Sequence, residues 1–199
     1  MKKSILILTA FSVSAFFVSC KKDNSTPITS GDIQGAWTFQ SMDVQTSSTQ
    51  EYTESGTNYK TVTTSDYTTQ ENSGTITIDA STIASTNVSY SVNSTAHASI
   101  YTNGTLLSST DFPLTVPTIT SSSTANYELV GADSIHFTSG SVFSDAVSGD
   151  IQSSGAKLSL DGNILYMTQN IFQTQSQTIG GIPMTITISA KAVAKLQKQ

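Results

Sequence analysis

The chain has 199 residues, a formal charge of −5 and nine basic side chains, all of them lysines. The absence of arginine argues against recognition of nucleic acids or phosphate groups, because the bidentate guanidinium group is the favoured side chain for both. Charged residues make up only 12% of the chain, whereas β-branched and aromatic residues are abundant. This composition favours an ordered β-protein over a disordered chain, and we predict no nucleic-acid partner.

The first twenty residues are typical of an export signal. Met1-Lys2-Lys3 forms a short basic start, and residues 5–18 are mostly apolar. A permanent membrane-spanning helix needs about 20 apolar residues, so this run is too short. A basic start before an apolar stretch of this length indicates a secretory signal peptide.

The end of that segment, Phe17-Val18-Ser19-Cys20, contains the only cysteine of the chain. It resembles the lipobox of bacterial lipoproteins, although leucine is more common where Phe17 stands. The resemblance implies that signal peptidase II cleaves between Ser19 and Cys20. It also implies that Cys20 receives a diacylglycerol on its thiol and a fatty acid, such as palmitate, on its new amino group. The alternatives are an ordinary signal peptide with an incidental cysteine, or a cysteine buried in an N-terminal helix.

A lipid on Cys20 would anchor the protein without a transmembrane helix. Each buried methylene contributes about 0.8 kcal/mol, so two or three acyl chains hold firmly where one holds only marginally. Cleavage leaves seven lysines and fourteen acidic residues, a formal charge of −7, so attachment must come from lipid and not from attraction to anionic headgroups. By analogy with that family, lysines rather than aspartate after Cys20 are compatible with release of the lipoprotein to the outer membrane of a Gram-negative envelope. Either face of that membrane fits.

Residues 20–32 are polar, contain a proline and a glycine, and show no periodicity. We predict a flexible tether with a reach of about 20 Å. The expected organisation is therefore a signal peptide at 1–19, the lipidated cysteine and tether at 20–32, and one β-domain at 33–199.

The ordered part begins with "GDIQGAWTFQ". Gly35 and Trp37 resemble the G-x-W motif of the lipocalins and lipocalin-like domains. The resemblance implies an up-and-down barrel closed at one end by Trp37, with an interior that could hold a small apolar ligand. The chain departs from the family because the arginine that packs on this tryptophan, the second motif and the long C-terminal helix are missing. Alternatively, Trp37 is a core aromatic of a different β-fold.

From Ile33 onward, apolar and polar residues alternate with the period of half-buried strands, as in "GTITIDA" and "GIPMTITISA". Glycine-containing turns such as Gly180-Gly181 separate these runs, and Asn103-Gly104 is the strongest hairpin signal because type I′ turns need positive φ twice. We predict an all-β antiparallel meander of about 8–10 strands closing as a lipocalin-like barrel, or alternatively a β-sandwich. Residues 58–72 are expected at an edge or rim, residues 139–155 as a loop, and the tail as a short helix or a strand extension.

Residues that carry chemistry are few and show no diagnostic grouping. His97 and His136 could bind a metal only if they paired across the sheet, but solvated strand positions fit them better. No nucleophile motif, phosphate loop or metal-ligand spacing is present, so we predict no cofactor, no metal and no enzymatic activity. No grouping typical of a catalytic pair is found among the carboxylates Asp43, Glu51, Glu54, Asp79 and Glu128. Asp145 and Asp150 could contact calcium, but the dense pattern of oxygen ligands that a calcium loop needs is missing.

One short motif indicates a modification. Asp133-Ser134-Ile135 matches the D-S/T-apolar pattern of a bacterial periplasmic O-glycosylation system, which would modify Ser134. A pattern of three residues also occurs by chance in unmodified proteins.

The predicted function is that of a non-enzymatic, membrane-anchored lipoprotein with a binding or scaffold role at the cell envelope. The first alternative is a carbohydrate- or protein-binding β-sandwich at the surface, with an exposed aromatic strip formed by Tyr52, Tyr59, Tyr67 and Tyr101. A hydrolase is the second alternative, and it would need a cleft where two carboxylates or a His–Asp pair converge.

Overall fold

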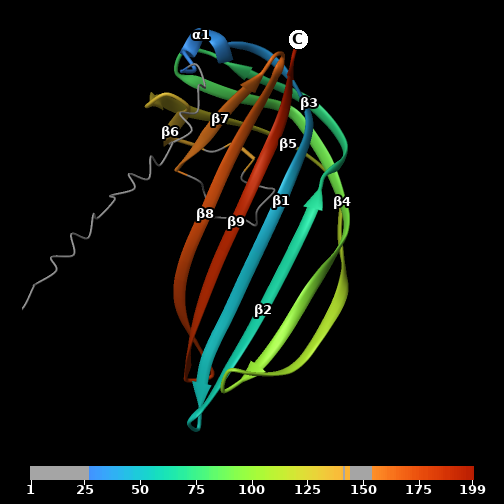
Figure 1. The fold of residues 1–199 in the computed structure, drawn as a ribbon, viewed down its shortest axis with the longest axis vertical. Coiled ribbons are helices and arrows are strands. Elements are labelled where there is room, and N and C mark those ends of the chain that lie inside the picture. The colour runs from blue at the N-terminus through green and yellow to red at the C-terminus, as the bar shows by residue number, and fades with distance from the viewer. Residues whose placement is uncertain (1–26, 141, 144–153) are drawn as a thin grey trace, which may run out of the picture.

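The computed structural model describes residues 27–140, 142–143 and 154–199. Within them lie one short helix and nine strands, shown in Figure 1. Their bounds are α1 (Ser30–Ile33), β1 (Gly35–Glu54), β2 (Thr57–Thr68), β3 (Gln70–Ile78), β4 (Thr82–Thr102), β5 (Thr105–Val130), β6 (Ser134–Ser139), β7 (Gly155–Asp161), β8 (Ile164–Ile179) and β9 (Ile182–Lys198). In these ranges no helix has the length and apolar character needed to cross a membrane.

The strands form one antiparallel sheet that closes on itself, because β9 pairs with β1 along most of its length. The all-β antiparallel barrel predicted from the sequence is therefore confirmed, and the β-sandwich alternative is wrong. At one end of the molecule the ring β1–β3–β4–β5–β6–β7–β8–β9 is complete. We call this part the barrel end.

The other half of the molecule is an open sheet, which we call the sheet extension. It consists of β2 and the distal parts of five other strands, in the order β5–β4–β2–β1–β9–β8. β6 and β7 are only 6 and 7 residues long, so they bridge β5 and β8 at the barrel end only. The hairpin tips of the extension lie at the opposite end from α1 and the C-terminus (Figure 1).

β2 and β3 run in the same direction between β1 and β4, and act as one strand interrupted at Thr69. β3 pairs with both neighbours at the barrel end, and β2 pairs with both in the extension. The buried Thr69 side chain accepts from the Met42 amide at 2.8 Å, while its own amide donates to the Met42 carbonyl at 2.9 Å. The expectation that residues 58–72 form an edge or rim is therefore wrong.

Three turns at the far tips have the conformation that the sequence signals require. Positive φ values occur twice in each of Ser55-Gly56, Asn103-Gly104 and Gly180-Gly181, the pattern of type I′ hairpins. The last two were predicted from sequence, whereas the first was not identified. The tail extends the last strand, since β9 continues to Lys198.

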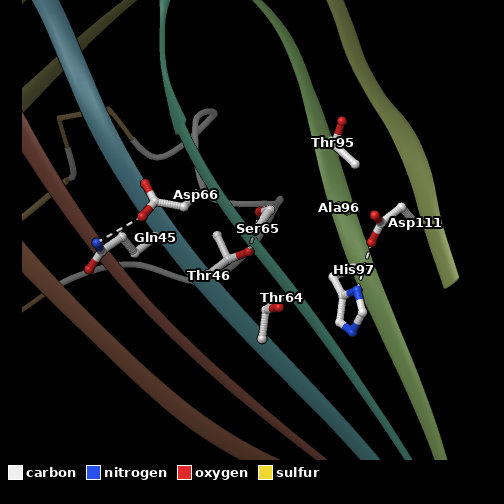
Figure 2. A pocket seen from close by; sticks show the side chains of 9 residues that line it. All are labelled: Gln45, Thr46, Thr64, Ser65, Asp66, Thr95, Ala96, His97 and Asp111. Atoms are coloured by element: carbon white, nitrogen blue, oxygen red, sulfur yellow. Dashed lines mark hydrogen bonds and ion pairs between the residues drawn. The ribbon is translucent and has the colours of Figure 1, made fainter. Parts of the chain in front are cut away.

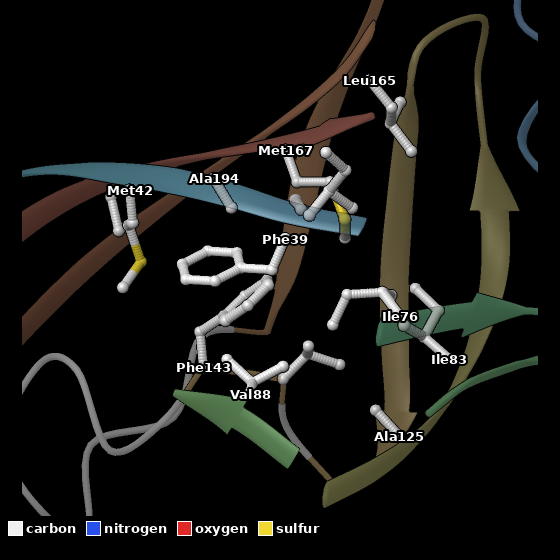
Figure 3. Close-up of a cluster of buried hydrophobic side chains, with 14 of the residues drawn as sticks. Phe39, Met42, Ile76, Ile83, Val88, Ala125, Phe143, Leu165, Met167 and Ala194 are labelled. Carbon is white, nitrogen blue, oxygen red and sulfur yellow. The ribbon is translucent and has the colours of Figure 1, made fainter. Parts of the chain in front are cut away.

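Side chains of the chain itself fill the barrel end (Figure 3). Phe39 lies at the centre, with its ring 5.5 Å from that of Phe143 and 6.5 Å from that of Tyr90. Val142 and Phe143 belong to the β6–β7 connection and are buried where the barrel opens toward the extension. The Gln169 side-chain amide donates to the Val142 carbonyl at 3.3 Å. Val142 and Phe143 are therefore part of the core, although most of the predicted loop 139–155 lies outside the described residues.

Candidate functional site

Cys20, which is predicted to carry the lipid anchor, and Ser19, which precedes the predicted cleavage site, lie outside the described residues. Gly35 is the first residue of β1, and Trp37 is fully buried at the barrel end. The indole Nε1 of Trp37 donates to the Ile33 carbonyl of α1 at 2.8 Å. Trp37 therefore connects the first strand to the helix that covers this end of the barrel.

A lysine lies over the Trp37 ring in a chain that has no arginine. Lys198 Nζ is 5.3 Å from the ring centroid, and it donates to the Asp32 carbonyl at 3.3 Å. A cation at this distance from an indole face is attracted by the ring quadrupole. The last strand therefore contributes a cation to the environment of Trp37 and ties the C-terminus to α1.

Asp32 stabilises the start of α1. Its Oδ2 accepts from the Thr29 amide at 2.8 Å and from the Thr29 hydroxyl at 2.7 Å, and these bonds hold the pKa of the Asp32 carboxyl below its ordinary value. Because the folded pKa is lowered, the stabilisation is present above the ordinary carboxyl pKa and is lost as the pH falls through the folded value.

We expect Asp32→Asn to be less stable than wild type near neutral pH and equally stable in strong acid. Urea unfolding curves of both proteins between about pH 6 and pH 2.5 measure this convergence. A stability difference that stays constant over that range would contradict a role for the ionised carboxylate.

Ser134, the predicted glycosylation residue, is the first residue of β6 and is half-buried. Its hydroxyl donates to Asp133 Oδ1 at 3.0 Å. Lys157 Nζ lies 3.2 Å from the other oxygen of that carboxylate, and this bond, with that from Ser134, lowers the pKa of Asp133. The Ser134 hydroxyl thus already belongs to a small polar group at the β5–β6 turn.

A candidate site that the sequence did not identify lies on the outer face of the sheet extension (Figure 2). His97 of β4 stands directly opposite Asp111 of β5, and His97 Nδ1 is 2.6 Å from Asp111 Oδ1. When Nδ1 donates to Asp111, Nε2 is left as an acceptor. It lies 3.2 Å from the Ser99 hydroxyl and 3.4 Å from that of Ser109.

The surroundings of His97 form a shallow depression of about 450 Å³ across β1, β2, β4 and β5. Gln45 donates to Asp66 at 3.1 Å on the β1–β2 side. The side chains of His97 and Asp111 are 49% and 69% exposed, so both remain in contact with water. The lining residues are Gln45, Thr46, Thr64, Ser65, Asp66, Thr95, Ala96, His97 and Asp111.

The order Asp–His–Ser is that of a hydrolytic triad, but the rest of such a site is missing here. A triad also needs donors placed for the oxyanion of the intermediate and a site that excludes water. β4 pairs with β2 on one side of His97 and with β5 on the other. The backbone amides of β4 are therefore used in hydrogen bonds between strands. The arrangement offers exposed hydrogen-bonding groups to a ligand and does not provide an activated nucleophile.

The two histidines do not pair. His136 stands opposite Glu128 of β5 and Gly155 of β7, whereas His97 stands opposite Asp111 and Thr64. Among the described residues no three histidine, cysteine or carboxylate side chains gather closely enough to hold a metal ion. Asp145 and Asp150 lie outside those residues.

Of the four tyrosines considered for an aromatic strip, only two come together. Tyr52 and Tyr59 face each other across β1 and β2 and stack, with ring centroids 5.1 Å apart and an angle of 19°. Tyr67 stands opposite Val44, and burial raises its pKa. Tyr101 stands opposite Lys60, the neighbour of Tyr59, and therefore points to the other face of the sheet. The single strip predicted from the sequence does not form.

Comparisons with known proteins provide no functional assignment. No protein-family model matches the chain, and no curated protein matches it. Among solved structures, that of Ail, the attachment invasion locus protein of Yersinia pestis, gives a TM-score of 0.15 at 7% sequence identity. The match covers 78% of this chain and 97% of that chain. A TM-score of this size carries no argument about fold or function.

Proposed function

We propose that the chain is an exported lipoprotein, anchored through Cys20 at the cell envelope, whose barrel end supports the sheet extension as a non-enzymatic binding or scaffold surface. The observation that carries the binding part is the contrast between the two halves of the molecule. The barrel end is filled with buried side chains, whereas the extension exposes polar side chains around His97. Among the described residues it also has two edge strands, β5 and β8, that pair there on one side only.

The filled barrel supports a surface role over that of a carrier for an apolar ligand. A carrier barrel needs an interior that its own side chains leave open. Here Trp37, Phe39 and Phe143 occupy the interior together with aliphatic residues from most strands. The groups available to a partner are the polar side chains around His97, the stacked Tyr52–Tyr59 pair and the strand edges.

The position of α1 supports projection of the extension away from an anchoring membrane. α1 and the first described residues lie at the barrel end, and the hairpin tips lie at the opposite end (Figure 1). β1 alone is 20 residues long, which corresponds to about 65 Å of strand. A lipid on Cys20 would therefore hold the barrel end near the membrane and place the tips far from it.

The anchor is tested by metabolic labelling with palmitate and by cell fractionation of wild type, Cys20→Ala and the matched control Ser19→Ala. We expect label and membrane association in wild type and in Ser19→Ala, which keeps a small residue before the cysteine, and loss of both in Cys20→Ala. Unlabelled wild type, or a Cys20→Ala protein that still sediments with membranes, would show that the anchor is not a lipid on Cys20.

The absence of enzymatic activity is tested at the His97 cluster. We expect His97→Ala to change the free energy of unfolding by less than about 1 kcal/mol, as is usual for exposed ion pairs. It should also leave the hydrolysis of p-nitrophenyl esters unchanged, because the cluster lacks an oxyanion site. Saturable ester hydrolysis in wild type that His97→Ala abolishes would favour the hydrolase alternative.

A second candidate function, carbohydrate binding, is favoured by the stacked Tyr52–Tyr59 pair. Both rings lie on one face of the sheet, because Tyr52 and Tyr59 stand directly opposite each other in the β1–β2 pair. Retention on immobilised polysaccharides that Tyr59→Ala removes, while Tyr101→Ala on the other face keeps it, would support this function.

A further inference from the structure

The edge of the sheet extension formed by β8 lacks the features that normally protect a free strand edge. Residues 164–168 of β8 pair with both β7 and β9, but residues 169–179 pair only with β9 in the part of the chain that the structure describes. This segment, QNIFQTQSQTI, contains no charge and no proline. We call residues 169–179 the β8 edge.

The opposite edge of the extension, formed by β5, is protected. It contains Asp111, Pro113 and Pro117, and β5 pairs only with β4 over these residues in the described chain. Proline and charged residues are the usual means by which natural proteins prevent edge-to-edge pairing. The two edges therefore differ, because of the two only the β8 edge has neither a charged side chain nor a proline.

The sequence of the β8 edge is complementary to itself in an antiparallel arrangement. If a two-fold axis passes through Gln175, residues whose numbers add up to 350 stand opposite each other. Gln175 then meets Gln175 of the second copy, and Thr174 meets Ser176. Two of the remaining pairs join identical residues, Gln173 with Gln177 and Ile171 with Ile179. In the third, Phe172 stands opposite Thr178, which carries no charge.

This register also keeps the two faces of the sheet consistent. In β8 the odd-numbered residues 171–179 stand opposite Ala190, Ile188, Ile186, Met184 and Ile182 of β9, so they share the inner face of the extension. Every pair adding up to 350 joins two odd or two even residues, and the inner faces of both copies therefore continue into each other. Phe172, which is 75% exposed, gains a neighbour across the new strand pair.

We propose that the β8 edge pairs with the β8 edge of a second copy, antiparallel and about a two-fold axis at Gln175, to give a dimer with one continuous sheet. Two observations favour a second copy as the occupant. The self-complementary register needs no other sequence, and the absence of charge removes any repulsion between identical strands. Antiparallel pairing places the two barrel ends at opposite ends of the dimer, so the proposal concerns copies that are not both anchored through Cys20 in one membrane.

A cysteine at the axis tests the register in the full-length chain. Residues directly opposite in an antiparallel pair have Cα atoms about 4.5–5.5 Å apart, which a disulfide can span. We expect Gln175→Cys to form a covalent dimer in detergent extracts on mild oxidation. The matched control Thr110→Cys lies on the protected β5 edge and should remain monomeric, as should wild type, whose own Cys20 sets the background.

Charge substitutions at the same position test the same pairing without a covalent bond. Gln175→Lys and Gln175→Glu each place like charges opposite each other, and we expect either protein alone to associate at least about fivefold more weakly than wild type. A mixture of the two should restore dimers, because opposite charges then meet. Association is measured by sedimentation in detergent.

The outcomes separate this proposal from the alternatives. Gln175→Cys that stays at the wild-type background, or charge variants that dimerise as well as wild type, would overturn the proposal. Cross-linking of Gln175→Cys to a different protein would overturn it too, because the occupant would then not be a second copy. None of these results bears on lipidation of Cys20, so failure of the dimer and failure of the anchor are distinguishable.

Discussion

Replacing Trp37 by alanine is expected to lower the free energy of unfolding by about 3–5 kcal/mol, the range measured for large aromatic residues in protein cores. Trp37 has no exposed surface, and it holds α1 through its bond to the Ile33 carbonyl. The substitution leaves a cavity at the barrel end and removes the partner of Lys198. Urea unfolding followed by far-ultraviolet circular dichroism measures the loss, since the variant has no tryptophan fluorescence.

Two controls separate the contributions at this position. Trp37→Phe keeps most of the apolar volume but loses the indole N–H, so it should be less destabilising than Trp37→Ala. Leu107→Ala removes a side chain that is 69% exposed and should change stability by no more than about 0.5 kcal/mol. If Trp37→Ala were as mild as Leu107→Ala, Trp37 would not be a central core residue.

Gly140→Ala is expected to destabilise the protein by about 2–3 kcal/mol. Gly140 has a φ of +71° at the start of the β6–β7 connection. A Cβ there would overlap the Thr124 carbonyl oxygen and lie 3.0 Å from the Ala125 Cα. Because these are backbone atoms of a neighbouring strand, the connection must shift, and Val142 and Phe143 shift with it out of the core.

The matched control is Gly104→Ala in the β4–β5 turn. Gly104 has a similar φ of +78°, but a Cβ there meets no atom within 4 Å. This variant should be destabilised only by the strain of a positive φ at a residue that carries a Cβ, about 1 kcal/mol. The difference in melting temperature between the two alanine variants therefore reports the close approach at Gly140, and equal melting temperatures would contradict it.

Local patterns were sufficient to predict the strands and two of the three far turns. The alternation in "GTITIDA" and "GIPMTITISA" corresponds to β3 and β9, because a half-buried strand has a side-chain period of two wherever it lies in the sheet. Asn103-Gly104 and Gly180-Gly181 form hairpin turns because few residues adopt positive φ twice in succession. The Ser55-Gly56 turn was missed because serine is a weaker signal for that conformation.

The His97–Asp111 pair shows why the candidate site could not be predicted. A two-residue turn at Asn103-Gly104 sets Thr102 opposite Thr105, and a regular hairpin would then place His97 opposite Thr110. The register shifts between Ile100 and Tyr101, and this irregularity brings Asp111 opposite His97. No sequence signal marks the bulge, because apolar residues follow one another there, Ile100-Tyr101 on β4 and Leu106-Leu107 on β5. Without strict alternation of apolar and polar residues, the pattern does not specify the register.

The placement of residues 58–72 failed for a related reason. Their polar pattern indicated an edge, because edge strands tolerate polarity on both faces. In the sheet extension, however, both faces of the central strands are open to solvent or only half-buried, so β2 can lie between β1 and β4 without an apolar face. The polar pattern of residues 58–72 therefore indicates that no apolar core lies beneath the strand. It does not indicate that a neighbouring strand is missing.

The sequence by itself determined the export signal pattern, the β-rich composition and most strand positions, because each depends on residues close together in the chain. Only the tertiary structure decided how β9 closes onto β1, that β6 and β7 close only one end, and that the barrel end is filled while the extension stays open. These features depend on pairings between residues far apart in the chain. The energy of such pairings comes from burying side chains together, and local periodicity does not encode which strands meet.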